Sequence, residues 1–149
     1  MLSNLLKIIE EEGIHIEWWD FKEPISAVYV EINNSKIIGL RKEIVRSNKK
    51  LKCTLAEELG HYFTGSTYSK RKPKNYREKI EISKEEYKAK KWQAFYLIPE
   101  EEFIKAIKKG IREVWELAEY FDVDEELIKF YLDIPKVKEN LIGVCKFED

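Results

Sequence analysis

The sequence predicts an α+β fold, in which a small antiparallel sheet packs on one central helix and a C-terminal cluster of short helices follows. Two observations predict it. Residues from about 14 to about 40 alternate apolar and polar side chains at strand spacing, and from about residue 48 onward the apolar residues follow helical spacing. With 149 residues, 44% of them hydrophobic, the chain is long enough to bury a core without a disulfide or metal. We therefore expect one compact unit with two parts, residues 1–99 and residues 100–149.

Charge and composition exclude several classes of protein. The chain has 27 Lys and Arg against 28 Asp and Glu, a formal net charge of -1, so it lacks the cationic field that usually accompanies nucleic-acid binding. Cys53 and Cys145 are isolated, which excludes a disulfide scaffold and favours buried or free thiols. No run of about 18 apolar residues occurs, and the first residues carry no basic segment of a signal peptide. We expect a cytoplasmic protein without a membrane anchor.

The N-terminal residues predict a helix followed by three strands. Apolar residues between Leu2 and Ile9 have helical spacing, and Gly13 follows where a helix end needs a residue that tolerates left-handed geometry. The strand spacing that comes next is interrupted at Asn33-Asn34, a pair typical of hairpin turns. The expected strands cover residues 14–18, 25–32 and 36–40.

The middle of the chain predicts one amphipathic helix from about residue 48 to residue 63, because Leu51, Leu55 and Leu59 form an apolar stripe. We expect this helix to end at Gly65. The polar residues 64–79 contain many lysines and arginines, and we interpret them as a solvent-exposed loop and not as a ligand site.

The remaining residues predict only helices. Ser83 and Glu86 have the spacing of a capping box, so we expect a helix to begin at Ser83 and to run toward Pro99, which opens the next one. The C-terminal cluster then consists of three short helices, around residues 100–109, 114–121 and 124–132.

The residues that could bind a metal or catalyse a reaction lie in the middle helix, in the stretch Thr54-Leu-Ala-Glu-Glu-Leu-Gly-His-Tyr-Phe-Thr-Gly65. In the zincin motif, two histidines four residues apart bind a metal from one helical face, and the Glu after the first histidine is the general base. Glu58 and His61 match this motif, whereas Glu57 occupies the first histidine position. Residues four apart lie only about 40° from each other around a helix, and a carboxylate also ligates zinc.

This stretch resembles the signature of the ImmA/IrrE family of metallopeptidase-like proteins, and the order of further segments agrees with it. The matching segments are residues 12–16, 55–61 and 86–99, the last ending in Leu-Ile-Pro. The family's Glu-x-x-Ala-Asn-x-Phe-Ala pattern corresponds to residues 86–93, which keep the Glu, the Ala and an aromatic residue but lack the Asn and the last small residue. The resemblance implies a zincin-like domain over residues 1–99 and a helix-turn-helix-like subdomain over residues 100–149.

The resemblance also implies roles for individual residues. It makes His61 and Glu86 metal ligands and Glu58 the catalytic base, while Glu57 stands where the family has its first histidine ligand. Two carboxylates and one imidazole give a ligand charge of -2 instead of -1, so a metal there would polarise its water less. The implied metal is zinc; manganese, iron or no metal remain open for an oxygen-rich site.

Each candidate residue also has a purely structural interpretation. Glu57 and Glu58 are also explained as surface carboxylates, His61 as a hydrogen-bonded histidine and Glu86 as a capping residue. Gly60 argues against these structural interpretations. A glycine inside a helix lowers helix stability by about 1 kcal/mol relative to alanine, so its presence indicates that another part of the protein packs closely against the helix there. Tyr62 and Tyr96 are alternatives for stabilising an oxyanion, although packing is the better interpretation, and His15 is expected to face solvent.

The function that the resemblance implies is a metal-dependent endopeptidase acting on a transcriptional repressor of a phage or mobile element. The alternative is a catalytically impaired pseudopeptidase that binds a regulatory protein. A nucleic-acid-binding module is a third reading, but the second helix of the helix-turn-helix-like segment begins Asp124-Glu125-Glu126, which opposes phosphate. We expect a protein partner, no direct nucleic-acid binding and no membrane, and the sequence leaves the oligomeric state open.

Overall fold

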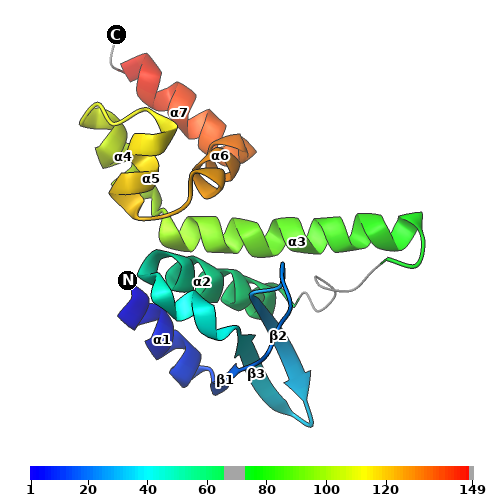
Figure 1. The fold of residues 1–149 in the computed structure, drawn as a ribbon. Coiled ribbons are helices and arrows are strands. Elements are labelled where there is room, and N and C mark those ends of the chain that lie inside the picture. Colours follow the sequence, from blue (N-terminus) through cyan, green and yellow to red (C-terminus); the bar gives the residue numbers. More distant parts are fainter. Residues whose placement is uncertain (66–72, 148–149) are drawn as a thin grey trace. The chain divides into compact units, whose positions relative to one another are not determined.

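The computed structural model describes residues 1–65 and 73–147, with side chains as far as residue 143 (Figure 1). The chain divides into two compact units, Met1–Gln93 and Ala94–Asp149. We describe each by itself, and the expected division into residues 1–99 and 100–149 stays a prediction.

The first unit contains the sheet and the motif helix, which confirms the α+β class. Its elements are α1 (Leu2–Glu11), β1 (Ile14–Trp18), β2 (Ala27–Ile32), β3 (Ser35–Leu40), the short 3-10 helix η1 (Lys42–Arg46), α2 (Asn48–Thr64) and most of α3 (Tyr76–Leu97). Gly13 follows α1 with φ of 69°, and Gly65 ends α2 with φ of 73°, so both glycines have the expected left-handed conformation.

The sheet is mixed, with strand order β1-β3-β2. β2 and β3 form the expected antiparallel hairpin, and Asn33 and Asn34, with φ of 51° and 66°, make its turn. β1 pairs with β3 in parallel, with Ile16 opposite Ile38, so the expectation of an antiparallel sheet is wrong for this strand pair. Alternating side chains identify the two faces of a strand but not its neighbours, and the connection from β1 to β2 places β1 on the far side of β3.

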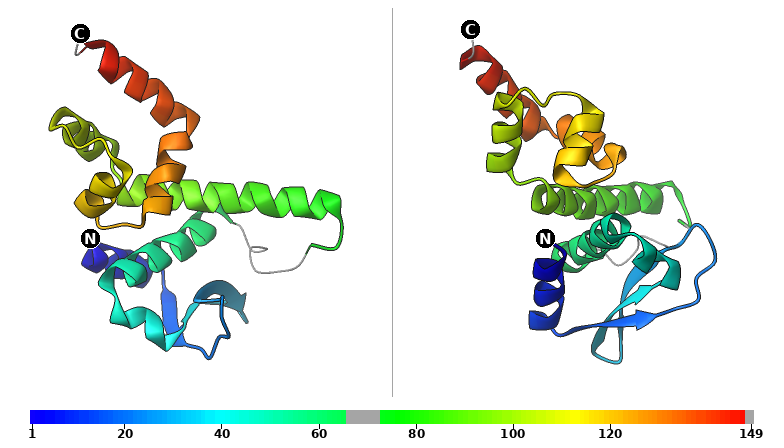
Figure 2. Two further views of the ribbon diagram at one scale, coloured as in Figure 1. Left: turned by 45° about the horizontal axis from the view of Figure 1, so that its top comes forward. Right: turned by 60° about the vertical axis from the view of Figure 1, so that its left-hand side comes forward.

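Within the first unit, α2 lies between the sheet and α3 (Figure 2). Its apolar stripe, with Leu55 and Leu59 fully buried, packs in a core that also takes side chains from α1 and β3. The buried hydrophobic residues of these two elements are Leu5, Ile9, Ile37, Ile38 and Leu40. The motif helix is therefore the centre of the unit, and both of its long sides are covered.

Helix α3 begins at Tyr76, so the predicted start at Ser83 is wrong, and so is the loop prediction for residues 76–79. The Oδ1 atom of Asn75 accepts a hydrogen bond from the backbone N–H of Glu78 at 2.8 Å and caps the helix there. The Ser83 hydroxyl instead donates to the carbonyl of Lys79, one turn earlier, at 2.9 Å. Residues 66–72, which hold part of the basic segment, lie outside the described residues.

The second unit is helical, with α4 (Glu100–Lys108), α5 (Val114–Phe121), α6 (Glu125–Asp133) and α7 (Pro135–Phe147) after the last turn of α3. The three expected helices are present, and Asp124 is the N-cap residue of α6 as predicted. The prediction of only three is wrong, because α7 follows with Pro135 as its first residue, a position that proline favours. None of the helices, over the residues that the structure describes, is long and apolar enough to cross a membrane.

Candidate metal centre

Helix α2 carries the motif residues in a regular, well-capped segment. The Ser47 hydroxyl accepts the backbone N–H of Lys50 at 3.2 Å at its N-terminus, and Gly65 closes its C-terminus. Because the helix is unbroken between these caps, Glu57 and His61 project from one side, one turn apart.

The structure brings the three residues predicted as ligands together. One ligand atom from each of Glu57, His61 and Glu86 lies within 4.8 Å of the other two. Nε2 of His61 is 3.7 Å from Oε2 of Glu86, so the side chain from α3 reaches the motif helix. His61 is buried and Glu86 is half-buried, with 38% of its side chain exposed. The cluster therefore has one shielded imidazole and two carboxylates that keep access to solvent.

The donor set of this cluster fits a divalent metal ion. Ligand atoms of a tetrahedral zinc lie about 2.1 Å from the metal and therefore about 3.4 Å from each other, close to the 3.7 Å between His61 and Glu86. Three protein ligands also leave a fourth position for water or substrate, as in catalytic zinc sites. The two carboxylates make the site richer in oxygen than a zincin site, which widens the range of metals that it fits.

Glu58, predicted as the general base, is on the same helix but outside this three-residue cluster. Only 1% of its surface is exposed, which is unusual for a carboxylate and disagrees with the interpretation as a surface residue. Glu57 is half-buried, and its position in the cluster disagrees with that interpretation too. The interpretation of Glu86 as a capping residue is wrong, because α3 begins ten residues earlier, at Tyr76.

Gly60 lies where α3 packs closely against α2, which explains why a glycine occupies the interior of this helix. A Cβ atom at this position would collide with the backbone carbonyl of Ala89 on α3. The two helices approach each other here, next to His61, more closely than any other residue would allow.

Tyr62 packs on the sheet, which confirms packing as its role. Its hydroxyl donates to Oε2 of Glu12 at 2.7 Å and accepts from Nζ of Lys36 at 3.0 Å, and its ring packs edge-on against Tyr29. The hydrogen bond with Tyr62 raises the pKa of Lys36, and burial raises the pKa of Tyr29. Of the other candidates, Tyr96 is half-buried and His15 is exposed as expected.

Sequence reasoning missed Gln93, which is buried on α3 with 6% of its surface exposed. Its side-chain amide donates to the backbone carbonyl of Cys53 on α2 at 2.8 Å. Two signals were available: a polar residue one helical turn after Ala89, on the face that carries Glu86, and the absence of the family's small residue at position 93.

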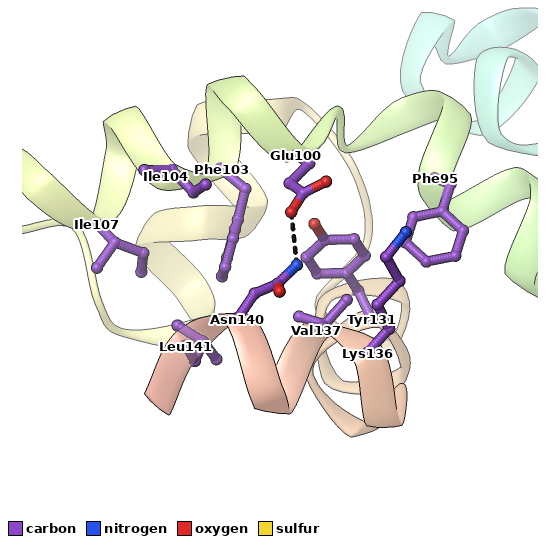
Figure 3. Close-up of a pocket in the computed structure, with 10 residues that line it drawn as sticks. All are labelled: Phe95, Glu100, Phe103, Ile104, Ile107, Tyr131, Lys136, Val137, Asn140 and Leu141. Carbon is purple, nitrogen blue, oxygen red and sulfur yellow. Dashed lines mark hydrogen bonds between the residues drawn. The ribbon is translucent and has the colours of Figure 1, made fainter. Parts of the chain in front are cut away.

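The second unit contains a separate, mostly apolar pocket between α4, α6 and α7 (Figure 3). It holds a cavity of about 20 Å³, room for roughly one water molecule. Phe103 and Tyr131 line it with their rings edge to face, and Asn140 on α7 donates a hydrogen bond to Glu100 on α4. The pocket is too small for a substrate, and none of the three ligand candidates lines it.

Comparison with family models identifies the family to which most of the chain belongs. Residues 9–133 match the family model of the IrrE N-terminal-like domain, the M78 peptidases. Neither the search of curated proteins nor the search of solved structures returned a match. The family match covers most of the chain and includes α2 with its motif and α3 with Glu86. The chain therefore belongs to the M78 peptidase family of IrrE N-terminal-like domains, the ImmA/IrrE family.

Proposed function

We propose that the protein is a metal-dependent endopeptidase of the ImmA/IrrE type that cleaves a transcriptional repressor of a phage or mobile element in the cytoplasm. The observation that carries the proposal is the cluster of Glu57, His61 and Glu86 in a chain of the M78 family. An imidazole and a carboxylate can pair with each other directly, but a second carboxylate at the same point repels the first unless a cation lies between them.

Glu57, His61 and Glu86 would hold the metal, for which we propose zinc. When bound, such a metal acts as a Lewis acid that activates water and polarises a carbonyl group. Glu58 then serves as general base, taking a proton from the water that attacks the peptide carbonyl and delivering it to the departing amine. Its burial keeps this carboxylate away from bulk water.

Glu57 makes the proposed enzyme slow. With Glu57 as a second carboxylate ligand, a bound metal would carry less net positive charge and would acidify the attacking water less than in a site with two histidines. The same feature supports the alternative proposal, a pseudopeptidase that binds its regulatory partner without cleaving it.

The partner in either proposal is a protein and not a nucleic acid. In the helix-turn-helix-like segment, α6 begins with Asp124, Glu125 and Glu126, all exposed. Trp115 on α5 is also 53% exposed, and a large exposed aromatic side chain suits a protein interface.

Replacement of Glu58 by Gln separates the two proposals. The proposed partner repressor and the protein are produced together in cells, and repressor level is followed over time. We expect the repressor to disappear with the wild type and to persist with Glu58→Gln, since the amide cannot take up the proton. Glu81→Gln, an exposed carboxylate of α3, serves as control and should behave as wild type. Undiminished repressor loss with Glu58→Gln contradicts hydrolysis by this mechanism, and a repressor that is bound but never cleaved supports the pseudopeptidase.

A further inference from the structure

The hydrogen bond from Gln93 to Cys53 is an unusual contact between two helices. It joins a buried side-chain amide of α3 to a backbone carbonyl in the interior of α2, over 2.8 Å. Burying an amide is costly unless it is hydrogen-bonded, and an apolar side chain of the same size would fill this place without that cost. Packing alone therefore does not explain a glutamine here.

The acceptor of this bond belongs to the turn that carries Glu57. In an α-helix the backbone N–H of residue 57 donates to the carbonyl of residue 53, and a carbonyl oxygen has a second lone pair for another donor. Gln93 uses that second position. It thereby fixes α3 to the same peptide group on which the backbone of Glu57 is anchored.

A second contact lies on the other side of Glu57. Gly60 meets the carbonyl of Ala89 so closely that no side chain fits between them. On α3, Glu86, Ala89 and Gln93 lie at helical spacing on one face, and Ala89 is fully buried. The two contacts are thus made by the same two helical faces that carry the three ligand candidates.

We propose that Gln93 and Gly60 are positioning residues for the metal centre, which set the spacing of α2 and α3 so that Glu86 reaches Glu57 and His61. The inference rests on the proposed function only in that these three residues bind a metal; it does not require hydrolysis. Ligands contributed by two helices bind tightly only if the helices are held at the right distance before the ion arrives. Residues that orient ligands typically change metal affinity by about 10-fold to 100-fold when they are replaced.

The test is the affinity for Zn²⁺ and Mn²⁺, measured by calorimetric titration of the metal-free full chain. Gln93→Met keeps the length and the volume of the side chain but removes its N–H groups. We expect Kd to rise about tenfold, with the thermal midpoint in chelator close to that of the wild type. Ser83→Ala is the matched control, because Ser83 is an exposed residue of the same helix that donates only within it. Its Kd should be unchanged.

Gly60→Ala is the stronger variant, and we expect a larger loss of affinity because the new Cβ pushes the Ala89 carbonyl, and α3 with it, away. If Gly60→Ala does not fold, the metal affinity of Gln93→Met still tests the positioning role. If His61→Ala loses the metal but Gln93→Met binds it with the affinity of the wild type, the positioning role is wrong and the metal site itself is not contradicted. Absence of metal binding in the wild type overturns both the positioning role and the proposed function, whereas metal binding without cleavage overturns only the latter.

Discussion

Nε2 of His61 on α2 lies 3.7 Å from Oε2 of Glu86 on α3, and Glu57 completes a cluster within 4.8 Å. A histidine and a carboxylate that the sequence separates by 24 residues thus converge on one point. Because the two residues lie on different helices, the approach of their side chains depends on how α2 and α3 pack against each other. A metal at this point would tie α2 to α3.

Metal content tests the cluster directly. Protein purified without chelator or metal-affinity resin should contain about one equivalent of metal, and His61→Ala, Glu57→Ala and Glu86→Ala should each lose most of it, since three ligands are the minimum for tight binding. Elemental analysis by mass spectrometry measures this, with Glu81→Ala as the control. Loss in the His61 and Glu86 variants but not in the Glu57 variant would exclude Glu57 as a ligand.

Replacing Glu57 by His should convert the site to the zincin ligand set. The ligand charge changes from -2 to -1, so we expect a shift in preference toward zinc over manganese and a faster hydrolysis of the target. Competition between the two ions, followed by calorimetry, gives the preference. An unchanged preference would show that residue 57 does not contact the metal.

Tyr62→Phe should lower stability without affecting the metal. The change removes the hydroxyl that bonds Glu12 and Lys36, and each such bond contributes about 1 kcal/mol. Urea unfolding should therefore show a loss of about 1–2 kcal/mol, with metal content as in the wild type. If cleavage stops while stability and metal are retained, Tyr62 has a catalytic role after all.

Tyr131 should make the second unit sensitive to alkali. Burial and the nearby Glu100 raise the pKa of its phenol to about 12, from an ordinary value of 10.0. Between these values the unfolded chain releases the proton and the folded chain keeps it, so stability falls as pH rises above about 10 and stops falling above about 12. Tyr131→Phe should remove about 1 kcal/mol of this loss between about pH 9 and about pH 11, as measured by urea unfolding. Identical pH profiles would contradict the assignment.

The acidic start of α6 predicts no salt-dependent binding of DNA. Fluorescence anisotropy with a labelled duplex at low salt should remain flat up to micromolar protein, since Asp124, Glu125 and Glu126 repel phosphate. Binding that weakens steeply with salt would show that the nucleic-acid-binding interpretation is right and the protein partner wrong.

The local features of the chain followed from local chemistry. Helix α2 was predictable because its apolar stripe repeats at helical spacing and Gly65 stops it, and the hairpin because Asn33 and Asn34 accept positive φ. The start of α3 was not predictable, because Ser83 has the residue pattern of a cap, whereas the actual cap is Asn75, eight residues earlier and next to a polar segment.

By itself, the sequence determined the α+β class, the motif helix, the family and the three residues that could hold a metal. Only the tertiary structure decided that Glu86 reaches the motif helix, that β1 lies parallel to β3 and that the Gln93 amide donates a hydrogen bond to the carbonyl of Cys53. The physical reason is that spacing along a chain fixes which side chains share a face of one element. Which faces meet depends on packing between elements, here on whether a glycine at position 60 lets two helices touch.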